Sequence, residues 1–296
     1  MARLCATLKI CSTTGPAAKR VNGPAICGTV IRSAAVWIFS VAMAAAASEH
    51  PCDAGSWAPV EAASLADART IVLSDGRTAR LAGLESLAAL ARDPATADAM
   101  DARLASRVAQ WLAAKPLRIR ILPGKPDRHG RRAALVMAGD ELLQEHLLSA
   151  GLAVFLPGIF PSDDAGDACA KRLLAVEAEA RLARRGGWSE PGFFVATARP
   201  DALSSQFGHF VIFQGFVRSV GTRRDRTYID FGRNWRSDVT VEIIDSRRRY
   251  FGGDAELEAL AGKFVRIRGF LEERAGPMVP ARHPAQIEIL TDTEPR

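Results

Sequence analysis

The amino-acid sequence predicts an α+β protein in which β-structure dominates, with three helices in a first domain and a smaller β-barrel after it. Two observations predict this fold. Over residues 55–192, short runs of alternating apolar residues are interleaved with three apolar patterns of helical spacing. Over residues 207–292, five strand patterns accompany one short helical pattern. A chain of 296 residues, 48% of them hydrophobic, is long enough to form both cores.

The first 47 residues differ in composition from the rest. They contain five basic residues and no acidic residue, and they lead into the apolar run SAAVWIFSVAMAAAAS at 33–48. A basic segment, a short apolar core and small residues in this order are typical of a secretory signal. The run is short and rich in alanine for a membrane span. We therefore expect a periplasmic or secreted protein with no transmembrane segment after cleavage; the alternative is an uncleaved N-terminal membrane anchor.

The net charge depends on this leader. The whole chain has 39 basic and 33 acidic residues, a net charge of +6. Without the five basic residues of the leader, 34 basic residues remain against 33 acidic ones. The basic balance of the whole chain therefore does not by itself indicate a nucleic-acid partner, and such a partner has to be argued from local clusters.

The cysteines divide in the same way. Three lie in the leader, so the mature chain keeps Cys52 and Cys169. Two cysteines in an exported protein are candidates for one disulfide. The alternative is that Cys169 is a core residue, because Leu173 and Val176 continue an apolar helical pattern from it.

The first domain is predicted to begin with a hairpin in DARTIVLSDGRTARLAGLESLA, residues 67–88, where Asp75-Gly76 is a favourable turn pair. Helical spacing and breaking residues predict three helices: one between Pro94 and Pro116, one around 142–148, and one from about 165 to 185. Alternating residues predict strands at 117–122 and 132–137.

The second domain is predicted to follow a linker at 193–206. Strand patterns and one helical pattern occur in the order strand, strand, strand, helix, strand, strand, at 209–220, 226–232, 238–245, 254–262, 263–271 and 285–290. This order is typical of the OB-fold, a small Greek-key barrel. We therefore expect an OB-like β-barrel over 207–292.

Three collinear segments of the first domain form one pattern: DARTIVLSDGRTARLAGLES, DRHGRRAALVMAGDELLQEHLLSAGLAVF and AEARLARRGGWSEP. In this order they resemble the Asp-Gly-Asp-Thr strand and hairpin, the central block, and the closing helix with its Trp-Ser motif of the staphylococcal-nuclease (thermonuclease) family. The resemblance covers about 130 residues. It implies an OB barrel with helices and, in active members, calcium-dependent cleavage of phosphodiester bonds.

The resemblance places two phosphate-binding arginines at Arg80 and Arg131. A guanidinium binds phosphate through two parallel hydrogen bonds and stabilises the charge that develops in the transition state. The family's tyrosine beside the second arginine is His129 in this chain, and an imidazole can also contact phosphate. The alternative is that both arginines are ordinary exposed side chains.

The acidic residues of the family motif are mostly replaced. Arg69 stands where a carboxylate would ligate calcium, and Leu87-Ala88 stand where a Pro-Glu pair would supply the general base. Glu85 remains as a candidate metal ligand or acid. We expect calcium as a cofactor if the domain is active and no cofactor otherwise. The nearby acids Asp93, Asp98 and Asp101 are the alternative source of a base, although acids also favour a first helical turn without any catalysis.

Arginines and aromatic residues alternate in the second domain. A basic groove with aromatic side chains is the pattern by which OB-folds bind single strands. The predicted nucleic-acid-binding residues here are Arg223, Arg224, Arg226, Tyr228, Trp235 and Arg236. The alternative is that the aromatic residues are core and that neighbouring acids balance the arginines, which leaves a protein partner in the cell envelope as the rival interpretation.

Three functional hypotheses follow. The first is an exported thermonuclease-like protein that binds nucleic acid through its phosphates and has weak or lost phosphodiesterase activity. The second is an active calcium-dependent endonuclease acting on DNA or RNA with relocated acids. The third is a structural or protein-binding envelope protein. The replaced acids favour the first hypothesis over the second, and the two retained arginines favour it over the third.

Overall fold

The computed structural model describes residues 50–113, 116–191, 193, 195–234 and 236–290. The leader at 1–47 and Trp235 lie outside the described residues. The described residues belong to one compact unit of mixed α+β structure with several β-sheets. None of the helices in this described part combines the length and apolarity needed to cross a membrane.

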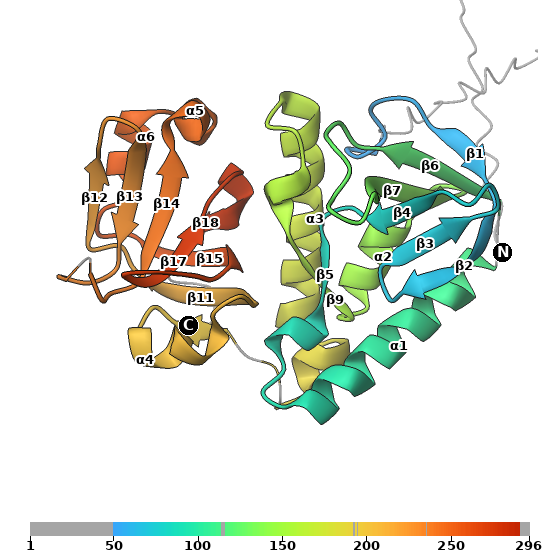
Figure 1. Ribbon diagram of the computed structural model, residues 1–296, viewed down its shortest axis with the longest axis horizontal. Coiled ribbons are helices and arrows are strands. Elements are labelled where there is room, and N and C mark those ends of the chain that lie inside the picture. Colours follow the sequence, from blue (N-terminus) through green and yellow to red (C-terminus); the bar gives the residue numbers. More distant parts are fainter. Residues whose placement is uncertain (1–49, 114–115, 192, 194, 235, 291–296) are drawn as a thin grey trace, which may run out of the picture. The chain divides into compact units, whose positions relative to one another are not determined.

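Seven strands form the largest sheet, which Figure 1 shows with α1 (Pro94–Leu112) running beside β2 and β3. Their order is β1 (Ala58–Val60), β6 (Leu117–Ile121), β7 (Arg132–Ala138), β4 (Thr78–Leu81), β3 (Thr70–Leu73) and β2 (Ala62–Asp67), with β8 (Glu141–Leu142) beside β7. This path does not return to its first strand, so the described pairings form an open sheet. The short strands β5 (Leu84–Ser86) and β9 (Ala153–Phe155) pair separately.

The three predicted helices of the first part are confirmed. They are α1, α2 (Leu143–Ser149) and α3 (Asp164–Leu182). In α1 the apolar pattern predicted from the sequence is the buried face: Met100, Leu104, Val108 and Trp111. Asp93 caps this helix by accepting a hydrogen bond from the Thr96 backbone N–H at 2.9 Å. Asp93 is therefore engaged in helix capping.

Two further sheets follow. One has the order β10 (Ala196–Thr197), β11 (Phe210–Phe216), β15 (Phe264–Phe270) and β18 (Ile287–Ile289). The other has the order β12 (Ser219–Thr222), β13 (Arg226–Asp230), β14 (Thr240–Ile244), β17 (Gly276–Pro280) and β16 (Glu272–Arg274). The short helix α6 (Asp254–Glu258) lies where the sequence predicted it.

Several sequence predictions for this part need correction. The segment predicted as one strand at 209–220 is divided between β11 and β12, which belong to different sheets. The hairpin β16–β17 was not predicted, because Pro277 and Pro280 weaken a strand pattern. The helix α5 (Asp245–Arg248) was also not predicted.

The segment predicted as a linker at 193–206 contains regular structure. Strand β10 pairs in parallel with β11, with Ala196 opposite Phe213. The helix α4 (Pro200–Leu203) follows, and Leu203 is fully buried. These contacts fix the segment to the sheet.

Both faces of β11 are buried, and each face belongs to a different core. Phe210 and Ile212 pack in the core of the first part. Val211 and Phe213, which point the other way, pack in the core of the second part. This sheet therefore separates two hydrophobic cores inside one compact unit.

In strand β15, arginines alternate with apolar residues and lie on the opposite face of the strand, where they are also buried. The side chain of Arg268 is fully buried and donates to Glu177 of α3 at 2.7 and 3.1 Å and to Glu288 at 2.6 Å. Arg181 also donates to Glu177, at 2.9 Å. Burial alone would lower the pKa of Arg268, but the charges of both glutamates raise it above its usual value. We call Glu177, Arg181, Arg268 and Glu288 the Glu177 cluster.

Cys52 and Cys169 form a disulfide that closes a loop of sequence separation 117. Both residues are fully buried, and Cys169 lies on the apolar face of α3. Both alternatives for Cys169 are therefore correct, since it is a core residue and a disulfide partner.

Candidate functional site

Strand pairing brings Arg80 and Arg131 together. Arg80 lies on β4 and Arg131 immediately precedes β7, and these two strands pair in parallel with Arg80 opposite Ala133. Thr70 of β3 is the cross-strand partner of Arg80. Both guanidinium groups donate to the Thr70 hydroxyl, at 3.4 Å from Arg80 and 3.3 Å from Arg131.

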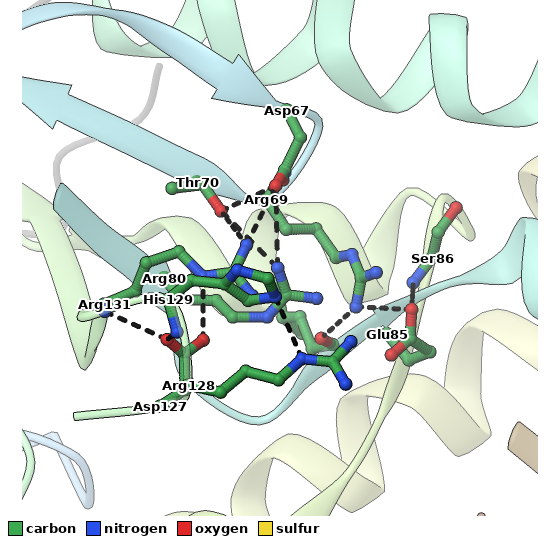
Figure 2. A network of polar contacts seen from close by, with 11 residues as sticks. Asp67, Arg69, Thr70, Arg80, Glu85, Ser86, Asp127, Arg128, His129 and Arg131 are labelled. Atoms are coloured by element: carbon green, nitrogen blue, oxygen red, sulfur yellow. Dashed lines mark hydrogen bonds and ion pairs between the residues drawn. The ribbon is translucent and has the colours of Figure 1, made fainter. Parts of the chain in front are cut away.

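One carboxylate, Asp67, lies near both arginines of this site. It lies at the end of β2, in the turn before β3, and accepts hydrogen bonds from the Arg69 backbone N–H and the Thr70 hydroxyl, both at 2.8 Å. The same carboxylate lies 3.2 Å from Arg131 Nη1 and 3.7 Å from Arg80 Nη1. Figure 2 shows both arginine side chains converging below Asp67. We call Asp67, Thr70, Arg80 and Arg131 the Asp67 cluster.

The charges within the cluster affect the pKa of its members. Burial raises the pKa of Asp67, but the Arg69 N–H, the Thr70 hydroxyl and the charges of Arg80 and Arg69 outweigh this effect and lower the pKa below its usual value. Burial and the charges of Arg69 and Arg131 lower the pKa of Arg80, against the opposing charges of Glu85 and Asp67. Arg80 therefore lies beside two like charges, whose repulsion an additional anion would reduce.

A second carboxylate, Asp127, fixes Arg131 from the loop before β7. Its side chain accepts from Arg131 Nε at 2.7 Å and from the His129 backbone N–H at 2.8 Å. Burial raises the pKa of Asp127, but these hydrogen bonds and the charge of Arg131 outweigh it and lower the value to about 2. The hydrogen bond to Asp127 involves the backbone of His129 and does not involve its ring. The ring Nε2 accepts a hydrogen bond from Arg128 Nε at 3.0 Å.

Arg69 extends toward Glu85, away from Asp67 (Figure 2). Its guanidinium forms an ion pair with the Glu85 carboxylate and donates to the Leu84 carbonyl at 3.1 Å. Both side chains are largely buried. Arg69 stands at the expected metal-ligand position, and Glu85 was the remaining candidate ligand. The charge of Arg69 therefore neutralises that of Glu85.

Calcium does not fit this donor set. Calcium takes six to eight oxygen ligands, mostly from carboxylates and carbonyls. Here Glu85 is paired with Arg69, and Asp67 faces two other arginines. Within the described residues, no three or more His, Cys, Asp and Glu side chains are grouped so that they could hold a metal ion.

The second predicted cluster is divided by the structure. Arg223, Arg226 and Tyr228 line one cavity of about 440 Å³ on the sheet of β12, β13, β14, β17 and β16. Arg224 and Arg236 are exposed, and neither is among the described residues that line the cavity. Burial raises the pKa of Asp230 in this cavity, against the effects of Thr240 and Arg223.

Sequence reasoning identified the arginines and missed their acidic partners. Asp67 and Asp127 organise Arg131 from two different loops, and neither was named as a site residue. A signal for both exists in the sequence, since an aspartate two residues before a turn residue often accepts from its backbone. Arg274 of the second cavity was missed because it belongs to a hairpin that the sequence did not predict.

Comparison of the sequence with models of known protein families gives no match, and comparison with curated proteins gives none either. The geometry of the two sites therefore carries the functional argument.

Proposed function

We propose that the protein is an exported thermonuclease-like module that binds the phosphate backbone of nucleic acid and has weak or lost phosphodiesterase activity. The observation that carries the proposal is the convergence of Arg80 and Arg131 on one side of Asp67. Two guanidinium groups with a shared, partly exposed carboxylate can exchange that carboxylate for a phosphate. The OB-like barrels expected for both parts are included in this proposal.

The chemistry of the site favours binding over cleavage. Hydrolysis of a phosphodiester needs a base to activate water, and losing such a base typically costs a factor of about 10² to 10⁴. Leu87 and Ala88 offer no side chain that accepts a proton, and Glu85 is neutralised by Arg69. Of the alternative acids Asp93, Asp98 and Asp101, Asp93 caps α1. The described contacts of the site therefore favour phosphate binding over activation of water.

Export is supported by the disulfide. Disulfides form and persist in oxidising compartments and are rare in the cytosol. Cys52 and Cys169 are both fully buried in this bond. Together with the basic and apolar leader, this pairing supports a periplasmic or secreted protein, with an uncleaved anchor as the alternative.

The test is binding of labelled single-stranded and double-stranded DNA and RNA in EDTA, measured by fluorescence anisotropy over a range of salt concentrations. We expect the logarithm of affinity to fall linearly with the logarithm of salt. The double variant Arg80→Ala/Arg131→Ala should bind more weakly and reduce the slope by about 0.7 for each lost phosphate contact with a single strand. Arg103→Ala, which removes an exposed arginine from α1, is the matched control.

Two results would reject the proposal. Binding that is absent, or unaffected by the double variant, would leave a structural or protein-binding role in the envelope. Rapid calcium-dependent cleavage that the double variant abolishes would establish the endonuclease alternative. A cleavage assay with calcium and with EDTA separates these outcomes.

A further inference from the structure

The cavity on the second sheet offers a site distinct from the Asp67 cluster. Its volume of about 440 Å³ is within the range of about 300–1,000 Å³ typical of small-molecule sites. The side chains that line it come from one face of the sheet, while the opposite face, with Ile229, Val241 and Val279, packs in the second core. The cavity is therefore a feature of a well-packed sheet.

Gly221 leaves open space in this cavity. It lies on β12 directly opposite Tyr228 of β13, so a side chain at 221 would stand beside the tyrosine ring. A Cβ atom built at Gly221 would meet no atom within 4 Å, and its φ lies outside the left-handed region. The backbone therefore does not require glycine here, and the missing side chain leaves room for a flat group beside Tyr228.

A buried carboxylate forms the floor next to Tyr228. Glu242 of β14 is the cross-strand partner of Tyr228 and is only 5% exposed. It accepts from Arg226 Nη1 at 2.6 Å and from Arg274 Nη1 at 3.3 Å. Glu242 therefore fixes two arginines at the border of the cavity, and each guanidinium has more N–H donors than these bonds use.

The next row of the sheet adds a second carboxylate and a third arginine. Asp230 accepts from the Thr240 hydroxyl at 3.2 Å through one oxygen, Oδ1. Arg223 is exposed in the turn after β12 and lines the same cavity. The cavity thus combines an aromatic ring, hydrogen-bond acceptors on its floor and guanidinium groups at its border.

We propose that this cavity binds one nucleobase together with its phosphate. The base lies in the space above Gly221 against Tyr228, its amino group donates to the carboxylates of the floor, and its phosphate contacts Arg223. A flat ring that carried only negative groups would face two carboxylates, whereas a base presents N–H donors to them. This site adds to the phosphate-binding site proposed above and does not depend on it.

The test is a substitution that fills the cavity and removes no side-chain contact. In Gly221→Val the added side chain occupies the space beside Tyr228, and valine suits a strand. The matched control is Thr222→Val, on the other face of the same strand, whose hydroxyl has no hydrogen-bond partner among the described atoms. We expect Gly221→Val to weaken binding of labelled oligo(dC) of about eight nucleotides by about five- to 100-fold, the range for loss of one stacked base. Thr222→Val should bind like the wild-type protein.

Two further measurements identify the ligand. Oligo(dT) should bind more weakly than oligo(dC), because thymine presents a carbonyl where cytosine presents an amino group. Competition by free cytidine monophosphate distinguishes the sources: strong competition that Gly221→Val abolishes identifies a free nucleotide, and weak competition identifies a base within a strand. The proposal is overturned if Gly221→Val binds oligo(dC) and cytidine monophosphate as Thr222→Val does.

The same comparison is repeated in the Arg80→Ala/Arg131→Ala background. If the base site binds independently of the Asp67 cluster, Gly221→Val should weaken binding by a similar factor in both backgrounds. If the double variant changes nothing while Gly221→Val weakens binding, the phosphate-site proposal fails and the base site stands. If the reverse is found, the base site fails alone.

Discussion

The Asp67 cluster and the Glu177 cluster each contain two arginines around a central carboxylate, with Glu288 as a second acid in the Glu177 cluster, but they differ in burial. The side chains of Asp67, Arg80 and Arg131 are 45%, 26% and 21% exposed, whereas those of Glu177 and Arg268 are 0% exposed. An exposed pair contributes little to stability because water solvates both partners when they separate. A buried pair cannot be separated without leaving a charge in the interior. The same chemistry can therefore bind a ligand in one place and hold two cores together in the other.

The hydrogen bonds of the two carboxylates sharpen this difference. Asp67 keeps its bonds from the Arg69 N–H and the Thr70 hydroxyl even if both arginines turn to a ligand. Glu177 has one backbone partner, the Phe155 N–H at 2.6 Å, and otherwise depends on Arg181 and Arg268. The arginines at Asp67 are therefore exchangeable, and those at Glu177 are structural.

The largest expected effect is at the buried cluster. Arg268→Met removes the ion pairs to Glu177 and Glu288 and leaves buried carboxylates partly uncompensated. We expect the free energy of unfolding, measured by urea denaturation, to fall by about 3–5 kcal/mol. Arg131→Met at the exposed cluster is the matched control and should change it by less than about 1 kcal/mol.

A double variant tests the cause of this loss. Glu177→Gln in the Arg268→Met protein removes the orphaned charge and should recover part of the lost stability. Equal losses in Arg268→Met and Arg131→Met would contradict the distinction between the two clusters.

The disulfide should have the next largest effect. It attaches the segment around Cys52 to α3, the helix that carries Glu177. Cys52→Ser/Cys169→Ser should lower the free energy of unfolding by about 2–4 kcal/mol, because the unfolded chain gains conformational freedom. Binding of DNA at the Asp67 cluster should be unchanged under conditions where the protein stays folded. A reducing agent should destabilise the wild-type protein and leave the double variant unaffected; destabilisation of both would contradict this assignment.

A smaller effect, in the opposite direction, is expected for ligand binding at the exposed cluster. Asp67→Asn keeps an oxygen for the Arg69 N–H and removes the negative charge that competes with phosphate for Arg80 and Arg131. Affinity for single-stranded DNA at low salt should rise by about two- to fivefold, as expected for an exposed ion pair. The matched control is Asp75→Asn, in the hairpin turn, whose partner is Arg77. Weaker binding by Asp67→Asn would show that Asp67 orients the arginines more than it competes for them.

The same two clusters show what the sequence can predict. The mixed α+β class, the three helices of the first part and most strands followed from apolar spacing and turn residues, which are local properties. Arg80 and Arg131 followed from motif resemblance. The strand predicted at 263–271 alternates Arg266 and Arg268 with Val265 and Ile267, and the structure buries both arginines.

The burial of Arg268 could not be predicted, because its acidic partner is distant along the chain. The acid that neutralises Arg268 is Glu177, 91 residues earlier and on a helix. Nothing local in the pattern of β15 shows that its polar face has a partner. In the same way, Asp67 and Arg131 lie 64 residues apart, so their contact depends on the pairing of β4 with β7. Sequence patterns predicted the elements and the types of side chain, whereas the pairing of charges needed the tertiary structure.

The smallest expected effect is a pH dependence at a buried histidine beside α3. His283 Nε2 lies 3.1 Å from Asp167 Oδ1, and its Nδ1 accepts from the Ala285 backbone N–H at 3.1 Å. Burial lowers the pKa of His283, and the charge of Arg247 adds to this, against the opposing charge of Asp167 and a hydrogen bond to the Pro161 backbone. The folded state therefore favours the neutral ring. Its contribution to stability is complete above the usual histidine pKa of about 6.5 and is lost as the pH falls through the lower folded value.

The variant His283→Asn tests this contribution, because its amide oxygen can still accept from the Ala285 N–H but does not titrate in this range. Thermal unfolding between about pH 7.5 and about pH 5 should show a smaller decrease in Tm for the variant than for the wild-type protein. The control is Asp67→Asn. The lowered pKa of Asp67 lies below this pH range, so this variant should show the same decrease in Tm with pH as the wild-type protein. Identical slopes for wild type and His283→Asn would mean that Asp167 compensates the buried imidazolium fully. A buried ion pair beside α3 would then behave like the exposed one at Asp67, which is the result that would most weaken the contrast between the two clusters.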